Sequence, residues 1–269
     1  MNENSTVCRL RRDDHRASQR GFTLVELMIA ILIGLFLVGG LLTLTGAMKR
    51  TGSIQNGLSQ MHDNERIALS LMTDAVQSSG YFPSPIGSTT ASSVFVATGS
   101  WAAAQTILGT DVGSGSTQTD TISVRYASAG SDGVLNCLGA TSSVAANWIA
   151  KFSLDGAGNL QCQLTTNGTV GTATPIATGV QYMQILYGVQ TNSSAGNFSV
   201  DTYLTATQVN AGSYWPNVIS VQVTLSMVNP LWCATNCQAG QQTTLQGQKQ
   251  YVQVSRTIAL MGRAGVNTT

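Results

Sequence analysis

One carboxylate, that of Glu26, lies inside the longest apolar run of the sequence. Residues 22–48 (FTLVELMIAILIGLFLVGGLLTLTGAM) contain no other charged side chain. A charge at the centre of a membrane helix costs of order 2.5–3.5 kcal/mol even on lenient insertion scales, so a cation should compensate for this one. If the chain were cut after Gly21, Phe22 would carry a new α-amino cation, four residues before Glu26 on the same helical face. The spacing predicts an ion pair, within one helix or between neighbouring helices, that would fix their register.

Residues 22–48 are also long enough to cross a membrane, because a helix needs about 20 residues to span the hydrocarbon core. Five arginines precede the run and two basic residues follow it: Arg9, Arg11, Arg12, Arg16, Arg20, Lys49 and Arg50. The positive-inside rule then keeps residues 1–21 in the cytoplasm and exports the rest. A secretory signal is one alternative, but its apolar region is only about 7–15 residues long, and the best small-residue cleavage site, at Thr45 and Ala47, is poor. A plain anchor, the other alternative, leaves Glu26 unexplained.

Charge is scarce in the rest of the chain. Asp, Glu, Lys and Arg make up 9% of the residues, against roughly 25% in ordinary globular proteins. After residue 20 there are eight basic and nine acidic residues, a net charge of −1. Phosphate binding needs concentrated positive charge, so nucleic acid is not expected as a partner.

Four of the five cysteines follow the apolar run and indicate an oxidising compartment. They are Cys137, Cys162, Cys233 and Cys237, while Cys8 lies in the basic leader. Three pairings into two disulfides are possible, and the lower entropy cost of short loops favours Cys137–Cys162 and Cys233–Cys237. Four free buried thiols are the alternative. A zinc site is disfavoured, because the C-x3-C spacing has no matching second pair and no nearby histidine.

Residues 20–27 (RGFTLVEL) resemble the prepilin peptidase recognition motif of type IV pilins and type II secretion pseudopilins. The basic leader before them and the unbroken apolar run after them belong to the same pattern. The resemblance implies cleavage between Gly21 and Phe22 on the cytoplasmic face, N-methylation of Phe22, and Glu26 as the glutamate that acts in assembly. The leader of 21 residues is longer than most type IVa leaders.

Residues 49–82 are expected to continue the same helix as an amphipathic half outside the membrane. Apolar side chains recur there at intervals of three and four residues, and Pro83 and Pro85 end the helix. The apolar positions are Ile54, Leu58, Met61, Ala68, Leu69, Met72 and Val76. Several glycines between Gly39 and Gly57, each costing about 1 kcal/mol relative to Ala, predict local bending or melting.

Residues 83–269 are expected to form a β-rich head. Residues 86–119 predict an irregular excursion with one weak strand and a mobile loop at 109–119. Later stretches alternate apolar and polar residues, most clearly 219–227, as in a strand of an antiparallel sheet with one wet face. Strands are predicted near residues 122–126, 151–154, 160–164, 183–189, 219–227 and 250–260, with a hairpin connection at 155–159. One long helix followed by these strands predicts an α+β fold, in which the helix packs on the sheet.

Further blocks of the chain resemble minor pilins of the PilW type. Residues 64–82 resemble that family's N-G-R-like helical turn with its closing Gly-Tyr pair, although Glu65 stands where the pattern usually has Gly. Residues 179–189 (GVQYMQILYGV) resemble its V-x-x-L-Q-V-x-Y-G-V-D strand, with Gln190 in place of the final acid. Later matching blocks are residues 201–206, 215–225 and 257–260. The resemblance implies a type IV pilin-like fold and a function in pilus assembly.

The residue pattern gives no support for catalysis. The two histidines, His15 and His62, are isolated in the sequence, and no G-x-S-x-G or P-loop motif is present. Residues 156–158 (GAG) lack the third glycine of a dinucleotide fingerprint. Calcium ligands in the turn 155–159 or the loop 197–201 lack the spacing of an EF-hand. We therefore expect no enzyme, no cofactor and no metal site.

The expected protein is a minor pilin with four parts: a cytoplasmic leader (1–21), a transmembrane assembly helix (22–48), its periplasmic half (49–82) and a head (83–269). Processed by prepilin peptidase, it would sit in the inner membrane with its head in the periplasm. It would then join other minor and major pilins in the filament through its N-terminal helix. One alternative is a minor pseudopilin of type II secretion, which shares the N-terminal motif. Another is an adhesin displayed on a pilus, which four tryptophans permit: Trp101, Trp148, Trp215 and Trp232.

Overall fold

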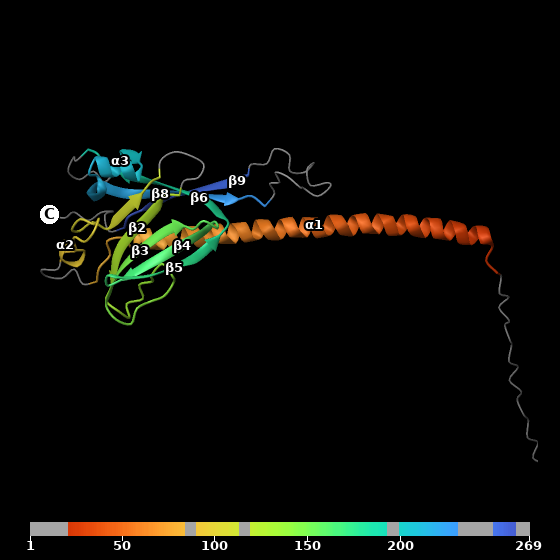
Figure 1. Ribbon diagram of the computed structural model, residues 1–269, viewed down its shortest axis with the longest axis horizontal. Coiled ribbons are helices and arrows are strands. Elements are labelled where there is room, and N and C mark those ends of the chain that lie inside the picture. Colours follow the sequence, from red (N-terminus) through yellow and green to blue (C-terminus); the bar gives the residue numbers. More distant parts are fainter. Residues whose placement is uncertain (1–20, 84–89, 113–118, 193–198, 231–249, 262–269) are drawn as a thin grey trace, which may run out of the picture. The chain divides into compact units, whose positions relative to one another are not determined.

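The computed structural model describes residues 21–83, 90–112, 119–192, 199–230 and 250–261 (Figure 1). The chain divides into two compact units, Met1–Ser53 and Ile54–Thr269, and each is described by itself. The long helix α1 (Leu24–Gln77) contributes residues to both units. The second unit also contains all the strands. This combination confirms the predicted α+β class, with a long N-terminal apolar helix and a C-terminal antiparallel sheet region.

In the first unit, α1 is apolar on all sides. Its most apolar 18-residue window has a mean hydropathy of 2.7, and none of that window is buried. Among the described residues, α1 is the one helix long and apolar enough to cross a membrane. The local melting predicted between Gly39 and Gly57 is wrong, because every residue there is α-helical. A broken helix would leave backbone groups without partners, and in apolar surroundings that costs more than a glycine does.

The second unit contains two antiparallel sheets rather than one. The first has the order β1-β2-β3-β4-β5 and is a meander of neighbouring strands: β1 (Ile107–Thr110), β2 (Thr121–Ser128), β3 (Ala146–Leu154), β4 (Asn159–Thr166) and β5 (Thr169–Thr178). The second has the order β7-β6-β8-β9: β6 (Val180–Val189), β7 (Thr202–Leu204), β8 (Val218–Val228) and β9 (Tyr251–Ala259). Short helices complete the unit: α2 (Ala91–Val94), α3 (Ala206–Ala211) and the 3-10 turn η1 (Trp215–Asn217).

The predicted strands are all found, and two segments differ from expectation. Residues Gly109 and Thr110, predicted to belong to a mobile loop, pair with β2 as the end of β1. Strand β5 was not predicted, because eight of its ten residues are exposed and its sequence shows no sustained alternation of apolar and polar side chains. The predicted hairpin at 155–159 connects β3 and β4 as expected. Pro85 lies outside the described residues, while α1 ends at Gln77, six residues before Pro83.

The core of the second unit lies between α1 and the strands. The helix buries Met61, Ala68, Leu69, Met72, Ala75 and Val76, which recur at helical spacing and form the face of α1 that packs into the head. On β8, Val221, Val223 and Leu225 alternate with half-buried polar residues and are themselves fully buried. All of these side chains belong to one hydrophobic cluster. The alternation seen in the sequence therefore identifies the strand face that packs into this core.

Asp120 joins the two sheets at a part of β6 that pairs with β8 on one side but is not reached by β7 on the other. Its backbone N–H donates to the carbonyl of Met183 at 2.9 Å, and its carboxylate accepts from the backbone N–H of Ile185 at 2.7 Å. Strand β7 pairs only with the last three residues of β6, so the aspartate satisfies backbone groups that β7 does not reach. Asp120 is only 6% exposed. Burial raises its pKa, and the bond from Ile185 opposes that rise.

A disulfide joins Cys137, in the loop 129–145 between β2 and β3, to Cys162 on β4. It is the first of the two pairings that loop closure favours. The same loop is held by Asp132, whose carboxylate accepts from the hydroxyl of Ser128 and the backbone N–H of Ala129, both at 2.7 Å. The remaining cysteines, Cys8, Cys233 and Cys237, lie outside the described residues.

Two aspartates should give opposite pH dependences of stability. Because the folded-state pKa of Asp120 is raised, its ionisation opposes folding, and stability falls as pH rises from about 4 through that folded pKa. Asp120→Asn keeps an acceptor for the N–H of Ile185 but has no carboxyl group to ionise. The free energy of unfolding of this variant, relative to wild type, should therefore increase as the pH rises over the same range. The measurement is the urea midpoint of the detergent-solubilised protein between pH 3.5 and 7.

Asp132→Asn is the matched control. The hydroxyl of Ser128 and the N–H of Ala129 lower the pKa of Asp132, so its contribution is present above about pH 4 and is lost as pH falls. This variant should therefore be less stable than wild type at pH 7 and should approach it in acid. Parallel pH profiles for the two variants would contradict the assigned roles.

Removing the disulfide should destabilise the head through the unfolded state. The bridge closes a loop of 25 residues, and the chain-entropy model gives about 3–4 kcal/mol for a loop of that size. Cys137→Ala, Cys162→Ala and the double variant should all lose nearly the same unfolding free energy in urea, because each breaks the same bond. Losses from the single variants that add in the double variant would mean that the two thiols act independently.

Candidate functional site

The start of α1 is defined by Thr23. Gly21, Phe22 and Thr23 precede the helix and are exposed. The hydroxyl oxygen of Thr23 accepts from the backbone N–H of Glu26 at 3.3 Å, and its carbonyl accepts from the N–H of Leu27 at 3.2 Å. Threonine at this position is a common N-cap, because it satisfies a backbone donor that has no partner within the helix. The helix therefore begins immediately after the predicted cleavage site.

Glu26 lies in the first turn of α1, near the two residues of the predicted cleavage site. A carboxylate there is favoured by the partial positive charge of the helix N-terminus. In the uncut chain Phe22 has no α-amine, and Glu26 forms no ion pair with the residues that the structure describes. Phe22 itself is 82% exposed. Gly21, Phe22 and Glu26 thus lie together at an accessible end of the helix.

The apolar side chains that follow are uncovered in the isolated chain. Every large hydrophobic residue of α1 from Leu24 to Met48 is more than half exposed, and Phe36 reaches 84%. A surface of this kind marks contact with lipid or with other protein. The helical hydroxyls along it bond to carbonyls in the preceding turn, as Thr43 does to Gly40 at 2.8 Å. Such bonds give the hydroxyls of Thr43 and Thr45 acceptors within the helix itself.

Asp155 and Asp201, the acids of the two loops considered for calcium, hold their own loops. Asp155 accepts from the backbone N–H groups of Ala157 and Asn159 at 2.9 and 2.8 Å, and its other oxygen accepts from the side chains of Asn159 and Gln161. The bonds from Asn159 lower the pKa of Asp155. Asp201 similarly accepts from the backbone of Thr191 and Asn192 at 2.8 and 2.9 Å. These carboxylates close turns, as short acidic side chains do in loops.

Within the described ranges, no three His, Cys, Asp or Glu side chains gather as a metal site would require. His62 is 61% exposed in its side chain and contacts Glu65 on the same helix at 3.3 Å. A surface pair at helical spacing accounts for both side chains.

Arg125 is a buried cation that the sequence did not identify. Alternation along β2 placed it on the wet face, but it is 6% exposed. Its guanidinium lies 5.6 Å from the ring of Phe95 and 5.0 Å from that of Trp101, and it donates to the carbonyl of Val96 at 3.0 Å. Burial lowers its pKa. Arg125 therefore fastens the segment after α2 onto the sheet by cation–π contacts and a hydrogen bond.

This placement also assigns structural roles to the tryptophans. Trp101 covers Arg125, and Trp148 and Trp215 are 3% and 8% exposed. The buried pair packs edge to face against tyrosines, Tyr126 at 5.5 Å and Tyr187 at 5.1 Å between ring centroids. Trp232 lies outside the described residues. Core packing and the Arg125 contact thus account for the described tryptophans without an adhesive surface.

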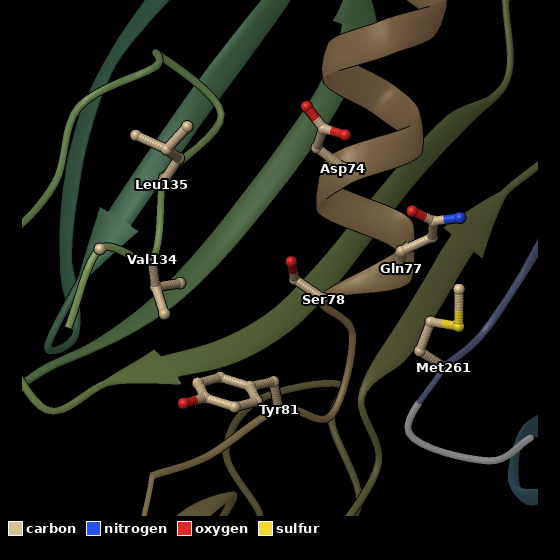
Figure 2. Close-up of a pocket in the computed structure, with 8 residues that line it drawn as sticks. Asp74, Gln77, Ser78, Tyr81, Val134, Leu135 and Met261 are labelled. Carbon is tan, nitrogen blue, oxygen red and sulfur yellow. The ribbon is translucent and has the colours of Figure 1, made fainter. Parts of the chain in front are cut away.

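A groove lies beside the C-terminal turn of α1 (Figure 2). It has a volume of about 540 Å³. One side is formed by α1 and the residues just after it, and the other by the loop 129–145, with Met261 at a third edge. The lining residues are Asp74, Gln77, Ser78, Tyr81, Gly133, Val134, Leu135 and Met261. Its mixture of one acid, small polar groups and exposed apolar side chains is that of a binding surface.

Comparisons with known proteins match both ends of this architecture. A family model for the prokaryotic N-terminal methylation motif matches residues 16–42, which include Gly21, Phe22 and Glu26. A model for type IV pilus-assembly protein W matches residues 148–263, from β3 to the end of the described chain. A search of curated proteins found no match.

These two matches agree with the structure. The methylation motif lies on the apolar start of α1, and the PilW model covers most of the strands of the head. Such a combination is typical of a structural subunit. The two matches together therefore support a PilW-type type IV pilin with an N-terminal apolar helix that fits a membrane anchor.

Proposed function

We propose that this protein is a minor pilin that takes part in assembly of the type IV pilus. Prepilin peptidase cuts between Gly21 and Phe22, Phe22 is N-methylated, and the mature chain enters the filament through α1. The observation that carries the proposal is the position of the methylation motif. Residues 16–42 match it, and Gly21 and Phe22 are exposed directly before a helix whose apolar surface has no cover in the isolated chain, which supports cleavage at this position.

The mechanism is a transfer of α1 from lipid into a bundle of like helices. Lipid and neighbouring helices both cover its apolar side chains. The apolar surface alone therefore does not fix the axial position of one helix relative to its neighbour. The α-amine created at Phe22 neutralises the carboxylate of Glu26, in the same subunit or in a neighbour. In apolar surroundings the cost of leaving either charge unpaired is high, and the pair therefore fixes the axial position of the incoming subunit.

The proposed topology follows from charge and redox chemistry. The arginine-rich leader, residues 1–21, stays in the cytoplasm, residues 22–48 cross the inner membrane, and residues 49–82 continue the helix in the periplasm. The head, residues 83–269, would then fold in the periplasm and later stand on the filament surface. The Cys137–Cys162 disulfide supports this placement, because disulfides persist in oxidising compartments.

A minor pseudopilin of type II secretion is the second candidate, since its N-terminal motif is the same. The match of residues 148–263 to a pilus-assembly family favours the pilus. Deleting the gene separates the two functions: loss of surface filaments with intact secretion supports the pilus, and the reverse supports the pseudopilus. A strain that keeps its filaments and loses only attachment would instead indicate an adhesin.

Replacing Glu26 should block assembly and spare processing. Glu26→Gln removes the charge while keeping the size of the side chain, so the peptidase site is intact but the Phe22 amine has no partner. We expect at least a tenfold loss of the protein from sheared filaments, measured by immunoblot, with a normal mature band in membranes. Glu65→Gln, on the same helix but in the head unit, is the control and should assemble normally. Wild-type incorporation of Glu26→Gln would contradict the mechanism.

Replacing Gly21 should stop processing. Gly21→Leu places a bulky side chain at the cleavage site, so the leader should stay attached. The chain of 269 residues has a mass of 28.2 kDa, and retention of the 21-residue leader should appear as a band heavier by about 2 kDa. Mass spectrometry of the wild-type protein extracted from membranes should find methylated Phe22 as its first residue. A native start at any other position would overturn the proposed processing.

A further inference from the structure

The groove beside the end of α1 gathers exposed apolar side chains from three separate parts of the head. Tyr81, Leu135 and Met261 line it, and they are 44%, 51% and 57% exposed. Val134 adds a fourth apolar side chain, half-buried, on the loop side of the groove (Figure 2). Large apolar side chains that share one hollow and remain open to water mark an interaction site, whereas scattered ones are ordinary.

The wall formed by the loop 129–145 is held in place before any partner arrives. The disulfide from Cys137 to Cys162 fixes the loop to β4 two residues after Leu135. Asp132 accepts from the backbone N–H of Val134 at 3.2 Å, in addition to its bonds at the start of the loop. The side chain of Asn136 accepts from the N–H of Leu138 at 2.9 Å. A surface ordered in this way loses little conformational entropy when it binds.

Asp74 is the one charged side chain in the lining of this groove. It is exposed, and no basic group pairs with it in the part of the chain that the structure describes. Next to it, Gln77 and Ser78 offer an amide and a hydroxyl that can bond to the backbone of a bound segment. An occupant complementary to this lining carries one cation and adjacent aliphatic groups, with polar backbone between them.

We propose that this groove binds an extended segment of a neighbouring pilin-class subunit, with a Lys or Arg of that segment against Asp74 and an aliphatic side chain against Leu135 and Met261. The inference rests on the proposed function for the identity of the partner. The charge of the partner residue follows from Asp74, and the aliphatic neighbour follows from the exposed apolar lining. Asp74 is the one charge in an otherwise neutral groove, so it favours a basic partner residue over an acidic one.

The test is site-specific photo-crosslinking of the full-length chain in intact cells. A benzophenone side chain is introduced at Leu135, and crosslinked peptides are sequenced by mass spectrometry. The same probe at Val144 is the control, because this residue lies on the same loop, is 67% exposed and does not line the groove. Each probe is combined with wild-type Asp74, Asp74→Asn and Asp74→Lys.

We expect the probe at Leu135 to crosslink to another pilin-class chain, within about three residues of a Lys or Arg. Asp74→Asn should lower the yield about two- to fivefold, the range measured for single exposed ion pairs, and Asp74→Lys should lower it further by repulsion. The yield at Val144 should not respond. The inference is overturned by a yield at Leu135 that is indifferent to Asp74, by a partner segment without a basic residue, or by a crosslink to residues 262–269 of the same chain.

The groove and the proposed function can fail separately in this experiment. Crosslinking in whole cells captures partners in the membrane as well as in the filament, so it does not require assembled pili. If the protein is found in sheared filaments while Leu135 crosslinks regardless of Asp74, the groove assignment fails and the minor-pilin function stands. If an Asp74-dependent crosslink to a pilin-class chain forms but the protein never enters filaments, the groove stands and the proposed assembly function fails.

Discussion

The apolar surface of the first half of α1 is the constraint from which the rest of the structure follows. Exposed hydrocarbon costs about 25 cal/mol for each Å² left in water, so this half requires lipid or other helices around it. The distribution of apolar side chains changes within the same helix. Beyond Ser53 they occupy one face of the helix, and that face is buried in the core of the head. One continuous helix thus presents an all-round apolar surface to its surroundings and a one-sided surface to its own domain. Glu26, the single acidic residue of the first half of α1, lies where an unpaired charge is most costly.

The head reaches a defined shape with very few charges by using them locally. Asp155 and Asp132 each accept several bonds within their own loops, and Asp120 substitutes for a missing strand partner along β6. Arg125 is buried under aromatic rings, with no acid close enough for an ion pair in the described structure. Each of these four charges therefore fixes one connection within the head. An exposed carboxylate that fixes nothing, such as Asp74, stands out against this background.

The sequence predicted those features that depend on a repeating pattern or on short distances along the chain. The apolar run, the helical stripe beyond it, the alternation in β8 and the spacing of Cys137 and Cys162 all belong to this kind. Features that depend on cover from a distant segment were not predicted. Alternation placed Arg125 on a wet face, and only the segment around Trp101, which packs over that face, makes it buried. β5 was missed for the converse reason: most residues of this edge strand are exposed, so little of it is buried and burial does not impose alternation.

Glycine shows most clearly why local energetics were insufficient. Gly57 was predicted to weaken the helix, yet α1 is unbroken there, and the absence of a side chain has another use. A Cβ at this position would approach the side chain of Pro230, at the end of β8, to 3.0 Å. The glycine therefore permits close packing of the β8 end against the helix, and that contact offsets part of its cost in helix propensity. Gly109 behaves in the same way, because a Cβ there would overlap the hydroxyl of Tyr187. In both cases a residue distant in the sequence packs against the glycine and leaves little room for a side chain. The neighbouring residues in the sequence could not indicate this contact.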